Sequence, residues 1–280
     1  MPRFRLLAVD IDGTLVNSSD QLSPATREAL LAAQRAGIRV VLATGRRYSR
    51  ALPFAEPLEI TAPLVTASGA LIKEPLGHRT LFQATFAGPL LRDVVSLVHE
   101  LGFDPVLYGD TFADSFDFYC AQLEVRQPEL AEYLARNPGC HRLWPSLVRD
   151  PPEGVFAGFV MGARDEMTAL RAELLRRFPD ALELHVLRSP RYHQGHMCEI
   201  LPAGVSKWSG IRRLTRMWDI ADHEVCAVGD DVSDVPMIEA AGLGVAMGNA
   251  LDEVKSAADR IAPTHDEDGL REVVDWLLEE

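Results

Sequence analysis

Acidic residues follow two apolar runs of this sequence, one near each end of the chain. Asp10 and Asp12 come directly after the run Leu6–Val9, and the segment 229–234, Gly-Asp-Asp-Val-Ser-Asp, follows the run 224–228. If these runs are parallel strands, their carboxyl ends lie at the sheet edge where α/β folds bind ligands. Carboxylates there are suited to Mg²⁺, and an aspartate can also attack phosphorus. Asp-x-Asp pairs also serve sugar-nucleotide transferases, and Asp and Gly are common in plain turns, so the first pair alone leaves these alternatives open.

A hydroxyl and a lysine stand at comparable places. Thr44 and Gly45 follow the apolar run 38–43, where the hydroxyl and backbone N–H groups either bind phosphate oxygens or simply begin a turn. Lys207 falls in the first turn of a helix that Ser206 introduces. A cation at a helix N-terminus opposes the helix dipole, so the helix itself does not require this lysine. It either reaches an anion shared with the helix end or is an ordinary surface lysine.

The combination of these segments is more specific than any one of them. In chain order they supply two carboxylates, a hydroxyl, a lysine and a second acidic cluster. The carboxylates of Asp230, Asp231 and Asp234 would repel one another unless a divalent cation relieved the repulsion. Phosphoryl transfer needs a nucleophile, Mg²⁺ ligands and positive charge on the phosphate oxygens. The set therefore matches what phosphoryl transfer needs.

Alternating strands and helices must position these residues. Ser23 and Pro24 form a helix start, as N-cap and first helical residue, and Gly37 supplies a stop. Short, wholly apolar runs are typical of parallel strands that are covered on both faces. The predicted strands are 6–9, 38–43, 64–67, 224–228 and 243–247. The predicted helices that alternate with them are 24–36, 206–217, 236–241, 251–258 and 268–278.

The middle of the chain has a different pattern. Its strands are longer and more mixed, and two amphipathic helices are visible at 89–101 and 164–178. We interpret this part as a second domain inserted into the first. The predicted fold class is therefore α/β, with a Rossmann-like parallel-sheet core domain at 1–85 and 192–280 and an inserted α/β cap domain at 86–191.

Composition narrows the class of protein. The chain has 280 residues, of which 41 are acidic and 28 basic, giving a formal net charge of −13. Such a charge repels a nucleic-acid backbone and an anionic membrane surface, and a small anionic substrate still fits a locally positive site. No apolar stretch approaches the roughly 20 residues of a membrane span. The four cysteines are scattered without zinc-site spacing, which is typical of reduced residues in a cytoplasmic protein.

Taken together, these motifs resemble those of the haloacid dehalogenase-like (HAD) hydrolase superfamily, in its Cof-type branch of sugar-phosphate phosphatases. The first family motif, Asp-x-Asp-Gly-Thr, is matched by residues 10–14, and the second, often Thr-Gly-Arg, by residues 44–46. The lysine motif, Pro-x-Gly-x-x-Lys, is matched by 202–207, and the last motif, Gly-Asp-x-x-Asn-Asp, by 229–234. Residues 246–250, Ala-Met-Gly-Asn-Ala, also resemble this branch. The resemblance covers essentially the whole outer domain.

The resemblance implies a role for each matched residue. Asp10 is implied to be the nucleophile and a Mg²⁺ ligand, and Asp12 the acid and base whose backbone carbonyl also ligates the metal. Asp230 is implied to complete the metal site, and Asp234 to orient Lys207 or a metal-bound water from behind it. The implied phosphate-binding residues are Ile11 through its backbone N–H, Thr44, Gly45, Lys207 and Ser233.

Substrate recognition is implied to come largely from the inserted domain, which in this family closes over the site. The arginine of the second motif and polar residues near the return crossing are the predicted contacts. These residues are Arg46, Arg188, Arg191, Tyr192 and His193.

Two positions depart from the family pattern. Ser233 stands where the last motif has Asn, and Ser68 stands where an Asn-Gly-Ala turn is usual. Serine still donates a hydrogen bond over a shorter reach, so the departure at Ser233 concerns phosphate affinity and not the reaction class. A phosphomutase, a phosphatase of a specialised sugar phosphate and a non-catalytic phosphometabolite-binding regulator remain alternatives on the same fold. We expect a Mg²⁺-dependent phosphatase of a small phosphorylated metabolite that binds neither nucleic acid nor membrane.

Overall fold

The chain folds into two compact units, each with its own sheet and its own core. The computed structural model describes residues 3–188 and 195–279. The first unit joins Met1–Phe82 to Ser206–Glu280, and the second unit is Gln83–Val205. Among the described residues, no helix combines the length and the apolar character needed to cross a bilayer.

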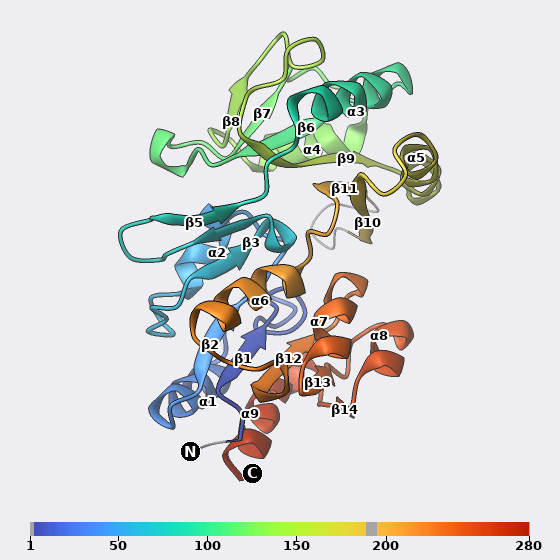
Figure 1. Cartoon of the computed structure of the whole chain (residues 1–280). Coiled ribbons are helices and arrows are strands. Elements are labelled where there is room, and N and C mark those ends of the chain that lie inside the picture. The colour runs from blue at the N-terminus through green and yellow to red at the C-terminus, as the bar shows by residue number, and fades with distance from the viewer. Residues whose placement is uncertain (1–2, 189–194, 280) are drawn as a thin grey trace. The chain divides into compact units, whose positions relative to one another are not determined.

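A five-stranded parallel sheet forms the centre of the first unit (Figure 1). The sequence predicts a parallel sheet correctly, but the edge strand Arg260–Ile261 was not among the predicted strands. Its strand order is β14-β13-β12-β1-β2, and every pair of neighbours is parallel. The inner strands β1 and β12 are wholly buried, which is why uninterrupted apolar runs encode them. The strand bounds are β1 Leu6–Val9, β2 Arg39–Leu42, β12 Val225–Gly229, β13 Leu243–Ala246 and β14 Arg260–Ile261.

Helices cover this sheet. Alternate strand residues, such as Ala8 and Ala227, pack with side chains of α6 and α7 in one apolar cluster. α1 packs along α9 and against β2. α1 begins as predicted, because the Ser23 side chain accepts a hydrogen bond from the backbone N–H of Thr26 and Pro24 is the first helical residue. The helices of this unit are α1 Pro24–Arg35, α2 Tyr48–Ala51, α6 Lys207–Met217, α7 Val235–Ala240, α8 Asp252–Ala257 and α9 Gly269–Glu279.

The third predicted strand departs from the parallel sheet. β3 (Leu64–Thr66) meets it through an isolated parallel bridge between Ala43 and Val65. β3 then pairs antiparallel with β4 (Leu71–Lys73), which neighbours β5 (Thr80–Gln83) in a separate three-stranded sheet. The short apolar run predicts a strand correctly, but it carries no information about the direction of the partner strand.

A left-handed turn reverses the chain between β3 and β4. Ala67, Ser68 and Gly69 have φ values of 46°, 53° and 98°. Only glycine takes such values without strain, and Gly69 has a second constraint. A Cβ atom there would lie 2.1 Å from the carbonyl oxygen of Ser206, the N-cap of α6. The turn therefore packs directly against the start of the helix that carries Lys207.

The second unit is built on a six-stranded sheet with the order β10-β11-β9-β6-β7-β8. All neighbours are antiparallel except β7 and β8. α3 and α5 pack on the sheet in one apolar cluster. The Tyr133 ring of α4 contacts the rings of Phe118 and Phe159, at centroid distances of 5.6 and 5.0 Å. The bounds are α3 Gly88–Glu100, β6 Val106–Gly109, β7 Phe118–Cys120, α4 Pro128–Arg136, β8 His141–Leu143, β9 Val155–Gly162, α5 Arg164–Arg177, β10 Leu182–Arg188 and β11 His196–Pro202.

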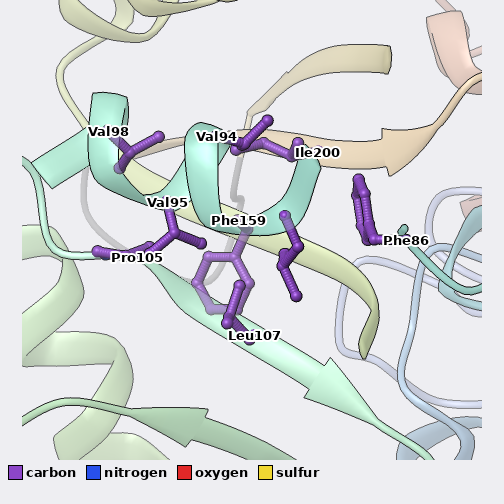
Figure 2. Close-up of a pocket in the computed structure, with 10 residues that line it drawn as sticks. Phe86, Val94, Val95, Val98, Pro105, Leu107, Phe159 and Ile200 are labelled. Atoms are coloured by element: carbon purple, nitrogen blue, oxygen red, sulfur yellow. The ribbon is translucent and has the colours of Figure 1, made fainter. Parts of the chain in front are cut away.

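A small cavity lies between α3 and the sheet of the second unit (Figure 2). Its volume is about 10 Å³, and it is surrounded by apolar side chains that include Val94, Val95, Leu107 and Ile200. This is close to the smallest space that holds one water molecule, and a buried water needs polar partners. The cavity is therefore part of the packed core and offers no ligand site.

The observed bounds of the two units differ from the predicted ones. The prediction ends the insertion at 191, whereas the second unit extends to Val205 because β11 pairs with both β9 and β10. It begins at Gln83, three residues before the predicted 86. α4 is an element that the sequence analysis missed, because its apolar stripe is confined to a helix of only nine residues.

Candidate active site

Loops at the carboxyl ends of three adjacent strands bring the predicted core residues into one region of the first unit. Asp10 follows β1, Thr44 follows β2 and Asp230 follows β12. β1 lies between β2 and β12 in the sheet, so these three loops are neighbours in space. The backbone N–H of Asp10 donates to the carbonyl of Val228 at 3.1 Å, which continues the β1–β12 pairing to the first catalytic candidate.

Lys207 bridges two of the predicted carboxylates. Its Nζ donates to Oδ1 of Asp10 at 2.7 Å and to Oδ1 of Asp234 at 2.7 Å. The lysine is only 3% exposed, so it is not an ordinary surface residue. The other oxygen of Asp234 accepts hydrogen bonds from the backbone N–H groups of Asp230 and Asp231, at 3.1 Å each. Asp234 therefore holds both the ammonium group and the loop after β12.

The site has too little positive charge for its carboxylates. Burial raises the pKa of Asp10 to about 8, with Lys207 opposing the rise and the charge of Asp234 adding to it. Burial also raises the pKa of Asp230 to about 9, with the charges of Asp10 and Asp234 adding to the rise. Burial alone would lower the pKa of Lys207, but Asp10 and Asp234 outweigh it and raise the pKa instead. One ammonium group thus faces three carboxyl groups.

The carboxyl groups fit a divalent cation. Asp10, Asp230 and Asp234 each present a carboxylate oxygen, and these oxygens lie within 4.8 Å of one another. Oxygen donors of this kind are the ligands that Mg²⁺ prefers, and the cation would supply the positive charge that the site lacks. The predicted ligand set shares Asp10 and Asp230 with this group; its third member is the Asp12 backbone carbonyl, which is not one of these carboxylate oxygens and stays a prediction. The Asp12 carboxylate itself contacts Arg46.

Gly13 lets the first motif approach the last. Its φ is +79°, and a Cβ atom there would lie 2.2 Å from Oδ2 of Asp230. The adjacent Thr14 hydroxyl donates to Oδ1 of Asp230 at 3.3 Å. The close contact between the two loops therefore requires glycine at position 13, and the Thr14 hydroxyl adds a hydrogen bond across it.

The predicted phosphate-binding residues also lie on loops of this unit. Thr44 is 1% exposed, and its Oγ1 accepts a hydrogen bond from the backbone N–H of Arg46 at 3.0 Å, which leaves the hydroxyl hydrogen for another acceptor. Gly45 is exposed and follows it. Ile11 is buried directly after Asp10, and Ser233 is 6% exposed in the turn after β12. Phosphate contacts by these residues stay a prediction.

Asp12 and Arg46 form an ion pair. Nε and Nη2 of Arg46 contact Oδ2 and Oδ1 of Asp12, at 2.7 Å each. Nη2 also contacts the carboxylate of Asp20. Arg46, a predicted substrate contact, thus binds two carboxylates of the protein itself. The spacing of these residues in the sequence does not indicate this pairing.

Asn249 is a residue for which the sequence analysis assigned no role. Its Nδ2 donates to the carbonyl of Gly13 at 2.8 Å, and its Oδ1 accepts from the backbone N–H of His265 at 2.9 Å. It thereby ties the loop after β1 to the loop after β13 and to the segment before α9. The only sequence signal was its place in the segment 246–250.

The remaining predicted substrate contacts belong to the return crossing. Arg188 is the last residue of β10 and is exposed. Arg191, Tyr192 and His193 lie outside the described residues. Their part in substrate binding stays a prediction.

Comparison with known proteins identifies the family. A family profile described as haloacid dehalogenase-like hydrolase matches residues 7–274, nearly the whole chain. The chain belongs to this family. It is a hydrolase of the HAD phosphatase type, in the Cof-type branch, as the four motifs imply.

Several curated relatives of this HAD chain are named as phosphatases. Phosphatase YwpJ of Bacillus subtilis is 31% identical over an alignment that covers 98% of this chain and all of the relative. The 5-amino-6-(5-phospho-D-ribitylamino)uracil phosphatase YcsE of the same organism is 28% identical, covering 98% of this chain and 96% of the relative.

Solved structures of the family share the fold. A haloacid dehalogenase-like hydrolase from Bacteroides thetaiotaomicron is 26% identical with a TM-score of 0.81, covering 98% of this chain and 99% of that one. A haloacid dehalogenase-like hydrolase from Bacillus subtilis is 28% identical with a TM-score of 0.79, covering 97% and 99% of the two chains.

Proposed function

We propose that this HAD hydrolase is a Mg²⁺-dependent phosphatase that removes phosphate from a sugar or polyol phosphate through an aspartyl-phosphate intermediate on Asp10. The observation that carries the proposal is the buried contact of Lys207 with both Asp10 and Asp234, beside Asp230. An ammonium group fixed on a carboxylate of raised pKa stabilises the ionised form that can act as a nucleophile.

The first step is attack by an Asp10 carboxylate oxygen on phosphorus. The new bond joins that oxygen to phosphorus, and the bond from phosphorus to the ester oxygen breaks. Asp12 gives a proton to the departing oxygen, which leaves as an alcohol. Lys207 and the Thr44 hydroxyl are placed to offset the negative charge on the remaining phosphate oxygens.

The second step restores the enzyme. Asp12, now ionised, takes a proton from a water molecule while that water attacks the phosphorus of the aspartyl-phosphate. The bond from phosphorus to the Asp10 oxygen breaks, and inorganic phosphate leaves. Asp12 ends the cycle protonated and ready for the next ester.

Asp10, Asp230 and the Asp12 backbone carbonyl would hold Mg²⁺. When bound, the cation neutralises charge on phosphate oxygens and on the crowded carboxyl groups. Asp234 remains the residue that orients Lys207, because both of its oxygens already accept hydrogen bonds from the protein.

The relatives and the net charge of the protein support the proposed substrate class. Three curated relatives, at 24–28% identity, are named for the phosphate ester of a ribitylaminouracil, which carries a polyhydroxylated chain. With a net charge of −13, the protein is poorly suited to polyanions, so a small phosphorylated metabolite is the expected partner. We propose that residues of the second unit, Arg188 among them, select the carbon skeleton. A cytoplasmic location stays a prediction.

The test is phosphate release from a panel of sugar, polyol and aryl phosphates with and without Mg²⁺. We expect turnover that requires Mg²⁺, with polyhydroxylated esters preferred and Asp10→Asn inactive although folded. Trapping with a phosphate analogue should label the wild-type protein at Asp10. Isomerisation of a sugar phosphate without phosphate release would indicate a phosphomutase, and binding without turnover would indicate a regulator.

A further inference from the structure

The guanidinium group of Arg46 holds the carboxylate of Asp12 at two points. Nε donates to Oδ2 at 2.7 Å and Nη2 donates to Oδ1 at 2.7 Å. A planar guanidinium that meets both carboxylate oxygens fixes the direction of the carboxylate as well as its distance. Lysine, with a single nitrogen, cannot reproduce this contact.

Arg46 is the anchored member of the pair. Its side chain is 8% exposed, whereas the side chain of Asp12 is 45% exposed. The backbone N–H of Arg46 donates to Oγ1 of Thr44, and its guanidinium carbon lies 5.1 Å from the centroid of the Phe54 ring. The loop backbone and the Phe54 ring thus fix the position of Arg46. Arg46 in turn fixes the more exposed carboxylate of Asp12.

Asp20 completes the arrangement. Its carboxylate contacts the same Nη2 of Arg46, and its backbone φ is +60°, a left-handed conformation. Asp12 and Asp20 both belong to the segment between β1 and α1. The buried Arg46 side chain therefore contacts two carboxylates of that segment, Asp12 and Asp20, and both carboxylates offset its positive charge.

We propose that Arg46 is a positioning residue: its two-point contact holds the Asp12 carboxylate while it is ionised, and one of the two contacts opens when that Asp12 oxygen carries the proton for the ester oxygen. Asp20 keeps Arg46 in place for this purpose. The inference rests on the proposed function, because it assigns Arg46 to the acid step of that reaction. It replaces the expectation that Arg46 contacts the carbon skeleton of the substrate. Three of the five N–H donors of the guanidinium are already used in these contacts.

The leaving group distinguishes a positioning residue from a substrate contact. Phenyl phosphate and 4-nitrophenyl phosphate have similar shapes, but phenolate is the more basic leaving group and depends more on a proton from Asp12. The ratio kcat/KM reports events up to cleavage of the ester bond, so it isolates this step. A correctly directed acid contributes about 10²–10⁴-fold, so an ill-directed one should lose a measurable part of that.

The experiment measures kcat/KM for both esters with saturating Mg²⁺. We expect Arg46→Lys, which keeps the charge and loses the two-point contact, to lower the value for phenyl phosphate at least about tenfold more than for 4-nitrophenyl phosphate. Arg50→Lys is the matched control, since Arg50 is exposed on α2, and it should leave both values unchanged. Asp20→Asn should also lower kcat/KM more for phenyl phosphate than for 4-nitrophenyl phosphate, by a smaller factor. This variant tests the proposal if Arg46→Lys folds poorly.

A double-mutant cycle with Asp12→Asn gives the second arm. If Arg46 acts through Asp12, Arg46→Lys should cost little on phenyl phosphate in the Asp12→Asn background. Equal losses on both esters, or a loss undiminished in that background, would overturn the inference and assign Arg46 to the substrate. Wild-type protein that releases phosphate from neither ester would instead contradict the proposed function.

Discussion

At the scale of single residues, the candidate site depends on buried charge. Lys207 contacts Asp10 and Asp234 with almost no exposure to water. The buried Lys207 ammonium group lies in a medium of low dielectric constant. Removing the ammonium group would leave the neighbouring carboxylates without a counter-charge. The residue that opposes the dipole of its own helix is therefore stabilised by tertiary contacts instead.

We expect Lys207→Met to lower both activity and stability. Breaking a buried ion pair by removing one partner costs about 3–5 kcal/mol, so the thermal midpoint should fall by several degrees. kcat/KM should fall by orders of magnitude, because the charge on the phosphate is no longer offset. Lys255→Met, on α8, removes a partly exposed lysine and is the control for both measurements. Equal melting curves for Lys207→Met and the control would argue against the buried pair.

Asn249 offers a second residue-level prediction. Asn249→Asp keeps the acceptor for the His265 N–H and removes the donor to the Gly13 carbonyl. A carboxylate beside that carbonyl should push the loop after β1 away, so we expect kcat/KM to fall about tenfold or more. Asn17→Asp is the matched control, since the Asn17 side chain acts as acceptor for the N–H groups of Ser19 and Gln21. Activity equal to that of the control would remove Asn249 from the set of positioning residues.

At the scale of elements, the site depends on loops that pack against helix starts. The left-handed turn at Gly69 lies against the N-cap of α6, and Gly13 lies against Asp230. Neither contact leaves room for a methyl group. The backbone of one element thus sets the position of a charged side chain on another.

We expect Gly69→Ala to reduce stability and activity together. The new methyl group would meet the Ser206 carbonyl, so α6 must shift and carry Lys207 with it. Gly77→Ala is a close control, because Gly77 also has a positive φ, +74°, with nothing within 4 Å of its Cβ position. The control should lose only the roughly 1–2 kcal/mol of backbone strain and keep its kcat/KM. If both variants lose activity equally, strain alone explains the effect and the contact with α6 does not.

The second unit contains a histidine whose protonation should stabilise it. His185 lies on β10, 3.2 Å from Glu199 and 3.5 Å from Glu183. Burial lowers its pKa, but the hydrogen bonds and charges of both glutamates outweigh this and raise the pKa from 6.5 to about 9. Because the folded-state pKa is above the unfolded one, the stabilisation is fully present below pH 6.5 and is lost as the pH rises through about 9.

The corresponding experiment compares wild type with His185→Gln from pH 6 to pH 9.5 by chemical denaturation. The stability advantage of the wild type should be largest at pH 6, on the order of 1–3 kcal/mol, and should shrink toward pH 9.5. The comparison between variants cancels the titration of carboxyl groups elsewhere. An advantage that stays constant with pH would show that His185 is neutral in the folded protein.

At the scale of the whole molecule, charge balance links metal binding to stability. The protein carries a net charge of −13, and the carboxyl groups of Asp10, Asp230 and Asp234 lie close together. A cation that binds the folded state alone stabilises it, by about 2.7 kcal/mol at a concentration 100 times the Kd. Proton release accompanies such binding, because raised pKa values keep the ligands protonated beforehand.

We therefore expect treatment with a chelator to abolish turnover and Mg²⁺ to restore it. Mg²⁺ should raise the thermal midpoint of the wild type and leave that of Asp230→Asn nearly unchanged. Calorimetric titration should show tighter binding at pH 8.5 than at pH 6.5, since fewer protons must leave. Binding that is equally tight at both pH values would contradict the raised pKa values of Asp10 and Asp230.

Sequence alone determined the parallel sheet, the helix starts and the residues at the strand ends. Leu6–Val9 and its partner strands are encoded by local apolar runs, and Ser23 and Pro24 encode a helix start through contacts within three residues. Such signals can be read from a sequence because the interactions behind them are local. The four motifs indicated the family and the chemistry, because their residues follow the family patterns at every defined position except Ser233.

Tertiary structure decided which of these residues meet. The pairing of Arg46 with Asp12, the tie from Asn249 to Gly13 and the place of β11 in the second unit all join segments far apart in sequence. The sequence also did not determine whether β3 pairs parallel or antiparallel with β4, since an apolar run has the same pattern in either orientation. Contacts of this kind depend on how whole elements pack, and no local pattern of residue types specifies that packing.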